Sequence, residues 1–236
     1  MSVVIEIRNF RASNSCVRRM VALLALAAIA LVIPTSTNAA NAPKPGAGTL
    51  SIKASVNPVL FGRSVVISGR LKGRDNTGKS ILLQQNPYPF AGYVDVGTAL
   101  TVTNGDYSFT VAPKLNTRYR VTAAITPPTT SGELLQTVKP KVSLRLSDST
   151  PARGQRVRFS GFVTPDHDGK LVRIQRRTST GSFRTIARVR LQDDGDSRSK
   201  YRRSIRLYSG GVFRVTFLAD LDHATGTSST RTVSVH

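Results

Sequence analysis

One eight-residue phrase occurs twice in the chain, and this repetition constrains the fold more than any other feature of the sequence. GRSVVISG occupies residues 62–69 and GQRVRFSG occupies residues 154–161, an offset of 92. Both follow the pattern Gly-x-x-Val-x-apolar-Ser-Gly, in which apolar residues occur at every second position. Such alternation is typical of a half-buried β-strand. The phrase therefore predicts that one β-structured unit is present in two copies.

Three further pairs of phrases follow in the same order at nearly the same spacing. They are Gly-Lys-x-apolar-x-apolar-Gln at 78–84 and 169–175, aromatic-Arg-Val-Thr at 119–122 and 213–216, and Thr-Val at 137 and 232. Chance similarity between strands would not keep this order. We infer two tandem domains, residues 49–139 and 140–236, each near the roughly 100 residues typical of an immunoglobulin-like β-sandwich.

The rest of the chain after residue 40 agrees with an all-β fold. Apolar residues alternate at 50–54, 142–146 and 187–191, and Asn, Asp, Gly and Pro clusters separate the alternating runs. We find no stretch with a helical period in this part of the sequence. The fold class is therefore predicted to be all-β, with two tandem immunoglobulin-like β-sandwiches after an N-terminal signal peptide.

The phrase itself has a structural interpretation. Gly62 and Gly154 are expected in turns where a positive φ costs little. The Val and Ile or Phe positions should point into the core. Gly69 and Gly161 are expected where a side chain would obstruct a close neighbour, or where the strand has a bulge.

The N-terminal region resembles a secretory signal peptide. Four arginines precede an uncharged apolar run, residues 20–33, and small residues follow it. We predict a signal peptide over 1–39, cleaved after Ala39 rather than Ala42, and a flexible Pro- and Gly-rich spacer over 40–48. An uncleaved N-terminal anchor is the alternative. The only cysteine, Cys16, would leave with the signal, so the mature chain would contain no disulfide.

The chain is strongly basic, with 34 Lys and Arg against 13 Asp and Glu and a net charge of +21. Residues 141–236 carry 19 basic and 8 acidic residues, whereas residues 43–140 carry 11 and 4. A charge of this size favours polyanions such as anionic cell-envelope polymers or acidic polysaccharides. A coding bias toward arginine is the alternative. Nucleic acid is disfavoured because Trp is absent and few aromatic residues are available for base stacking.

The repeated phrases resemble the bacterial immunoglobulin-like repeats of secreted and surface proteins, of the type found in actinobacteria. Residues 62–69, 78–84, 104–111 and 117–121 carry the resemblance in the first copy, and 154–161, 169–175 and 211–216 in the second. The resemblance implies spacers, adhesive modules or ligand-binding stalks without catalysis. The second copy departs from the pattern at 194–201, which is longer and more charged, so its strand boundaries there are open.

One group of residues in the second copy suggests a binding site. Arginines occupy positions between the apolar residues of its predicted strands, so they should face water. On one sheet they would form a polyanion-binding face through guanidinium forks. The alternative is a solvated outer face that discourages aggregation. The candidate residues are Arg158, Arg173, Arg188, Arg190, Arg206 and Arg214.

The sequence gives little support for a metal site or an enzyme active site. Asp166-His167-Asp168 and Asp220-Leu221-Asp222-His223 could form a metal pair, and 193–196 could bind calcium, but turn chemistry explains both. No Gly-x-Ser-x-Gly elbow, P-loop or dinucleotide motif occurs. We therefore expect no catalytic residue, no metal and no cofactor.

The sequence favours a secreted or cell-surface, non-catalytic protein whose basic face adheres to an anionic polymer. A purely structural module, or a subunit that docks on a partner protein by strand pairing, is the first alternative, and an exposed apolar edge strand would favour it. A hydrolase-type enzyme is the second alternative, which a deep pocket around His167 or His223 would favour. Contact with a membrane is expected only through an uncleaved leader.

Overall fold

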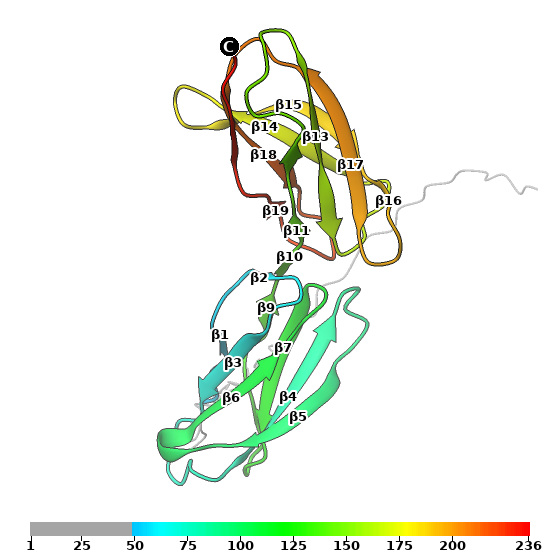
Figure 1. Cartoon of the computed structure of the whole chain (residues 1–236). Coiled ribbons are helices and arrows are strands. Elements are labelled where there is room, and N and C mark those ends of the chain that lie inside the picture. The colour runs from blue at the N-terminus through cyan, green and yellow to red at the C-terminus, as the bar shows by residue number, and fades with distance from the viewer. Residues whose placement is uncertain (1–48) are drawn as a thin grey trace, which may run out of the picture. The chain divides into compact units, whose positions relative to one another are not determined.

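A computed structural model describes residues 49–236, so the predicted signal peptide and spacer lie outside the described residues. The described chain is built from strands, with one 3-10 turn at Thr103–Gly105 and no α-helix among these residues (Figure 1). Residues 49–236 contain no helix with the length and apolarity needed to span a membrane. The all-β prediction is confirmed.

The first module has two main sheets. In the β3 sheet, β3 (Val65–Arg70) lies between β1 (Lys53–Ala54) and β6 (Asp106–Val111). The β4 sheet has the order β5 (Val94–Leu100), β4 (Ser80–Pro87), β7 (Thr117–Ala123), with β8 (Thr129–Thr130) and β9 (Leu134–Gln136) both paired to β7. A parallel pair of β2 (Val59–Leu60) and β10 (Val138–Lys139) completes this module.

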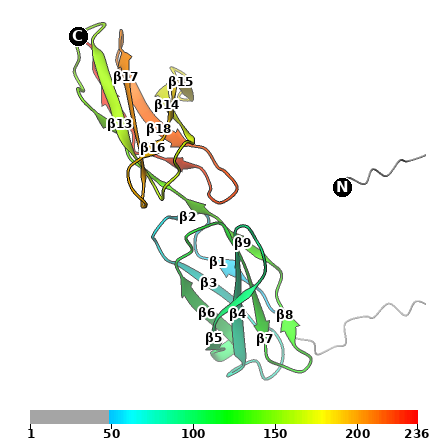
Figure 2. The same ribbon diagram turned by 90° about the vertical axis from the view of Figure 1, so that its right-hand side faces the viewer.

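The second module repeats this topology (Figure 2). The β13 sheet contains β13 (Arg156–Thr164), which pairs with β11 (Lys141–Val142), β12 (Arg145–Leu146) and β17 (Ser199–Arg206), and β16 (Gln192–Asp193) pairs with β17. The β14 sheet has the order β15 (Phe183–Arg190), β14 (Leu171–Arg177), β18 (Gly211–Phe217), with β19 (Gly226–Thr227) and β20 (Arg231–Val233) on β18. Two facing antiparallel sheets with this order make each module an immunoglobulin-like β-sandwich.

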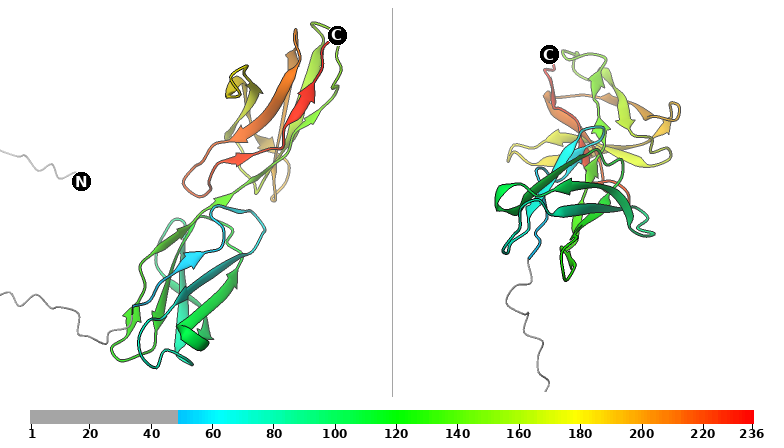
Figure 3. Two further views of the ribbon diagram at one scale, coloured as in Figure 1. Left: turned by 90° about the vertical axis from the view of Figure 1, so that its left-hand side faces the viewer. Right: turned by 90° about the horizontal axis from the view of Figure 1, so that it is seen from below.

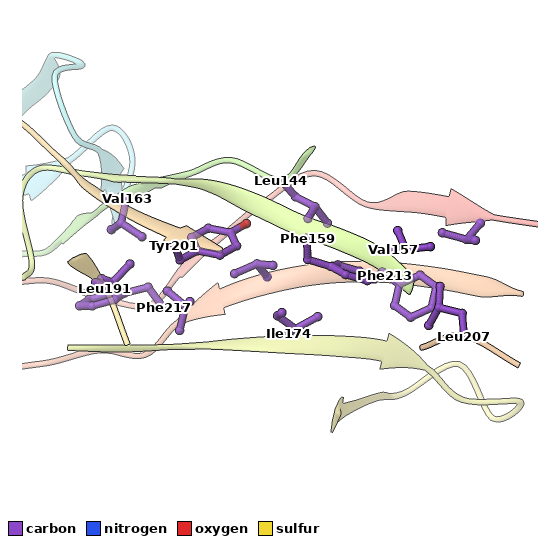
Figure 4. Packing of buried hydrophobic residues seen from close by; sticks show 13 residues of the cluster. Leu144, Val157, Phe159, Val163, Ile174, Leu191, Tyr201, Leu207, Phe213 and Phe217 are labelled. Atoms are coloured by element: carbon purple, nitrogen blue, oxygen red, sulfur yellow. The ribbon is translucent and has the colours of Figure 1, made fainter. Parts of the chain in front are cut away.

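A separate apolar core fills each sandwich. In the second module Phe159 faces Phe213 with ring centroids 5.3 Å apart, and Val157 and Ile174 are fully buried beside them (Figure 4). The C-terminal segment lies against residues 151–153 of the same module, where Arg153 N–H donates to the His236 carbonyl (Figure 3).

The structure explains the repeated phrase. Gly62 and Gly154 have φ of +75° and +82°, as expected for turn glycines. A Cβ at Gly69 would lie 1.9 Å from the carbonyl oxygen of Ser51. A Cβ at Gly161 would lie 2.2 Å from that of Ser143. The close-neighbour interpretation of these two glycines is therefore confirmed.

The first predicted strand of the second module is interrupted. The alternation at 142–146 predicts one continuous strand, whereas the structure has β11 and β12 on either side of Ser143 and Leu144. The Ser143 carbonyl accepts a hydrogen bond from the Tyr201 hydroxyl at 2.6 Å. This side-chain bond takes the place of a backbone ladder bond, so the strand is broken at that point.

Candidate anion-binding face

The six candidate arginines lie on both sheets of the second module. Arg158 and Arg206 belong to β13 and β17 of the β13 sheet, and the other four belong to β14, β15 and β18 of the β14 sheet. Arg173 lies opposite Arg188, and Arg190 lies opposite Leu171, so these residues share the outer face of the β14 sheet. The structure therefore does not gather the six arginines into one face.

Arg214 has a structural role within the β14 sheet. Its Nε donates to Gln175 Oε1 at 2.8 Å, and its guanidinium carbon lies 3.8 Å from the centre of the Phe183 ring. The first module repeats this arrangement: Arg120 donates to Gln84 at 2.8 Å, and its guanidinium lies 3.9 Å from the centre of the Tyr93 ring. In both copies, therefore, the Arg of the repeated phrases is hydrogen-bonded to the Gln and stacked on an aromatic ring.

The outer face of the β13 sheet is more strongly basic than the sequence indicates. Arg156 lies opposite Arg206, Arg158 opposite Ser204, and Arg202 and Arg145 lie on either side of Ser160. All these side chains project away from the core, because Val157 and Phe159 between them point inward. The exposed cations of this face are Arg145, Arg156, Arg158, Lys200, Arg202 and Arg206.

Within residues 49–236, the five arginines of this face form no ion pair with a carboxylate. Lys200 Nζ lies 3.3 Å from Asp194, and Arg198 Nε lies 2.6 Å from the same side chain. These two cations hold the pKa of Asp194 below its usual range through hydrogen bonds, against a smaller opposing effect of burial. The carboxylate of Asp194 therefore partly neutralises the charge of Lys200, and the five arginines keep their positive charge unpaired in the described part of the chain.

A groove of about 630 Å³ crosses this face above Gly161. Arg145, Lys200 and Arg202 line it together with the ring of Phe162, which is 37% exposed. Gly161 and Ser143, the residue at which the edge strand is interrupted, also line this groove. Asp194 also lines the groove, and the guanidinium carbon of Arg198 lies 4.0 Å from the centre of the Phe162 ring.

The first module has a smaller hollow, of about 360 Å³, at the equivalent position. There Arg70 and Asp106 lie opposite each other and form an ion pair at 2.6 Å. The second module has Phe162 opposite Lys200 at this position. Similarly, Val66 lies opposite Thr110 in the first module, whereas Arg158 lies opposite Ser204 in the second. Lys53 of the first copy corresponds to Arg145, so the face is basic in both copies and more strongly basic in the second.

Sequence reasoning did not identify Arg145, Arg156, Lys200 and Arg202 as candidates. Lys200 and Arg202 fall in the charged stretch where the strand boundaries were open, and Arg145 lies in a strand that the structure breaks. Their alternation with Ser199, Tyr201 and Leu144, all buried, was the available signal.

Two acidic and histidine-containing loops, explained above as turns, meet at one end of the second module. His167, Asp220, Asp222 and His223 each offer a ligand atom, and these atoms all lie within 4.8 Å of one another. The histidine side chains are only 3% and 2% exposed. Both imidazole rings are therefore shielded from solvent, whereas Asp220 also lines a surface hollow of about 220 Å³. Asp166 instead accepts a hydrogen bond from Ser199.

Comparisons with known proteins give a limited result. No family model matches the chain, and no curated protein matches it. Among solved structures, the chain is similar to bovine butyrophilin, with a TM-score of 0.41 and 11% sequence identity. The match covers 79% of this chain and 99% of that chain.

Proposed function

We propose that the protein is a non-catalytic binding protein, secreted or at the cell surface, that adheres to an anionic envelope polymer. The outer face of the β13 sheet is the binding surface. An immunoglobulin-like sandwich suits this role, because its sheets provide a rigid platform that needs no cofactor and no moving part.

The observation that carries the proposal is the difference between the two copies at one equivalent place. In the first copy the Arg70–Asp106 ion pair lines a hollow of about 360 Å³, whereas the second copy has a wider groove lined by Arg145 and Arg202. Arg202 is not required for folding, since the first copy forms an equivalent sheet with Ser108 at this position. We infer that these arginines, which form no ion pair within residues 49–236, bind an external anion.

The face fits phosphate or carboxylate groups spaced along a chain. Guanidinium groups donate two parallel hydrogen bonds to such anions, and several adjacent cations give avidity to a repeating polymer. Exposed contacts of this kind are screened by salt, because the Debye length falls to about 3 Å at 1 M. Retention on the polymer should therefore fall steeply between low salt and about 0.5 M.

The experiment measures salt-dependent retention on immobilised lipoteichoic acid and on polygalacturonate, which distinguish phosphate from carboxylate recognition. The test variant is the triple substitution Arg145→Ser, Arg158→Ser, Arg202→Ser. The matched control removes the same charge from β15 with Arg184→Ser, Arg188→Ser, Arg190→Ser. All six side chains are exposed, so both variants should fold.

We expect the test variant to lose at least tenfold in affinity and the control to lose little. Equal losses would indicate attraction by net charge without a binding face. Retention that persists unchanged to about 0.5 M salt would contradict the proposal altogether.

A second candidate function is docking on a partner protein by strand pairing. It is favoured by β5, an edge strand of the β4 sheet whose apolar side chains are exposed: Val94 is 54%, Val96 41% and Leu100 66% exposed. Such an edge can accept a strand from another chain. Replacing Val96 with Lys should abolish capture of a partner by this edge without changing retention on the anionic polymers.

A further inference from the structure

A cluster of four side chains at one end of the second module has the features of a metal site. His167 lies in the loop between β13 and β14, and Asp220, Asp222 and His223 lie in the loop between β18 and β19. The strands from β14 to β18 separate the two loops in the sequence, and the sandwich brings the loops together. We call these four residues the His–Asp cluster.

The ring of His167 is held in one orientation. Its Nδ1 lies 2.8 Å from the backbone carbonyl of Pro165, which can only accept, so Nδ1 carries the proton and donates. Its Nε2 then bears a lone pair. This atom is buried, has no hydrogen-bond partner among residues 49–236, and lies 3.9 Å from Asp220 Oδ2.

The ring of His223 is held in the opposite tautomer. Its Nε2 lies 2.9 Å from the backbone carbonyl of Lys114 and donates to it. Its Nδ1 therefore bears the lone pair, is likewise buried without a partner in the described chain, and lies 3.4 Å from Asp222 Oδ1. A histidine that donates one N–H to a carbonyl and leaves the other nitrogen free is the usual arrangement of a metal ligand.

The two carboxylates add negative charge at the free nitrogens. One oxygen of Asp220 accepts the backbone N–H of His223, which leaves the other oxygen directed at His167. Two unpartnered buried nitrogens and two adjacent acids are costly together, and a cation would satisfy all four.

We propose that the His–Asp cluster binds one divalent transition-metal ion of the zinc class through Nε2 of His167, Nδ1 of His223 and the carboxylates of Asp220 and Asp222. Tetrahedral zinc with bonds of about 2.0–2.1 Å places its ligands about 3.3 Å apart. The separations of 3.4 and 3.9 Å are close to this value, and all four ligand atoms lie within 4.8 Å of one another.

The ligand types select the metal. Imidazole nitrogen suits zinc, copper, nickel and iron, whereas calcium and magnesium prefer oxygen ligands in larger number. Four protein ligands, of which the two histidines are buried and the two aspartates half-buried, are typical of a structural rather than a catalytic zinc site. The ion would fix the loop between β18 and β19, and it is independent of the anion-binding face on the β13 sheet.

The test uses the full chain with Cys16→Ser, which removes the only thiol, and without a histidine tag. Two variants each delete one proposed ligand atom and keep the orienting hydrogen bond. In His167→Asn the amide nitrogen can replace Nδ1 as the donor to Pro165. In His223→Gln the amide nitrogen can replace Nε2 as the donor to Lys114. The matched control, Asp196→Asn with His236→Gln, removes an exposed acid and a histidine that lie outside the cluster.

Calorimetric titration of the chelator-treated protein with zinc chloride should give one ion per chain. Each ligand variant should bind at least tenfold more weakly, and the control should bind normally. Zinc at 100 times its Kd should raise the melting temperature by about 5 °C or more. Because the variants could lose stability, ¹⁵N spectra of the unmodified rings provide an independent test. Zinc should shift Nε2 of one histidine and Nδ1 of the other.

Absence of zinc binding by the folded protein would overturn the proposal. So would unchanged affinity in both ligand variants, or a zinc-induced shift at the nitrogens assigned here as hydrogen-bond donors.

Discussion

The hydroxyl of Tyr201 donates a hydrogen bond to the backbone carbonyl of Ser143 at 2.6 Å, directly above Gly161. Tyr107 and Ser51 form the same bond at 2.5 Å above Gly69 in the first module. In each sandwich the bond therefore passes over the strand that contains the glycine and joins the segments on its two sides. This relationship explains why the chain repeats the last glycine of its phrase.

Replacing Tyr201 with Phe tests the contribution of this bond. The ring still fills the core (Figure 4), but the Ser143 carbonyl loses its partner. We expect a loss of about 1–2 kcal/mol in the free energy of unfolding, measured by urea denaturation. Tyr208→Phe is the control, because Tyr208 is 62% exposed and should change stability little. Equal effects of the two substitutions would contradict this role.

Replacing Gly161 with Ala should be more damaging. The new Cβ would lie 2.2 Å from the Ser143 carbonyl oxygen and 2.8 Å from the Tyr201 hydroxyl, so the edge strand must move. We expect destabilisation of about 3 kcal/mol, at the upper end of overpacking effects. Gly97→Ala in β5 is the matched control, because a Cβ there meets nothing within 4 Å. A normal urea midpoint for Gly161→Ala would show that no close approach exists in solution.

The buried tyrosines predict a sensitivity to alkali. Burial raises the pKa of Tyr107 and Tyr201 above the ordinary value, and raises the pKa of Tyr119 to about 12. The unfolded chain ionises its tyrosines near pH 10, whereas the folded chain keeps these three protonated. Their stabilising effect is therefore complete below about pH 10 and is lost as the pH rises toward the folded values.

For Tyr119, whose pKa is raised to about 12 by burial, the difference from the unfolded chain is about two pH units. Urea midpoints measured from pH 8 to pH 11 should fall once the pH exceeds about 10, and ultraviolet difference spectra should show these tyrosines ionising only as the modules unfold. A midpoint that stays constant across this range would contradict the burial of the three hydroxyls.

The sequence alone was sufficient to predict the sandwich and much of its core. The alternation of Val157 and Phe159 with polar residues requires only that one face of the strand be buried, and both side chains are fully buried. The repeat then extends this inference to the first module, because equivalent positions in two copies have the same environment.

The sequence could not show which arginines share a face, because strand pairing determines this and alternation within one strand does not. A bulge between Ile174 and Gln175 shifts the register of β14 against β15. The side chains of β15 therefore do not alternate regularly between the two faces of the sheet at this point. The sequence favours turns over a metal site at the His–Asp cluster for a related reason. His167 and His223 are 56 positions apart in the sequence, and only the packing of two loops places their free nitrogens together.

Arg214 and Arg158 are expected to have different roles: Arg214 stabilises the β14 sheet, whereas Arg158 binds the anionic polymer. Arg214→Lys keeps the positive charge but loses the Nε–H bond to Gln175 and the planar stack on Phe183, so we expect a loss of about 1–2 kcal/mol in stability. The salt concentration that elutes this variant from an anionic polymer should not change. Arg158→Val places the first-copy residue on the β13 sheet, and it should leave the urea midpoint unchanged and lower the elution salt. If Arg214→Lys lowered the elution salt as much as Arg158→Val, the anion would be bound by the β14 sheet as well, and the assignment of the binding face to the β13 sheet would be wrong.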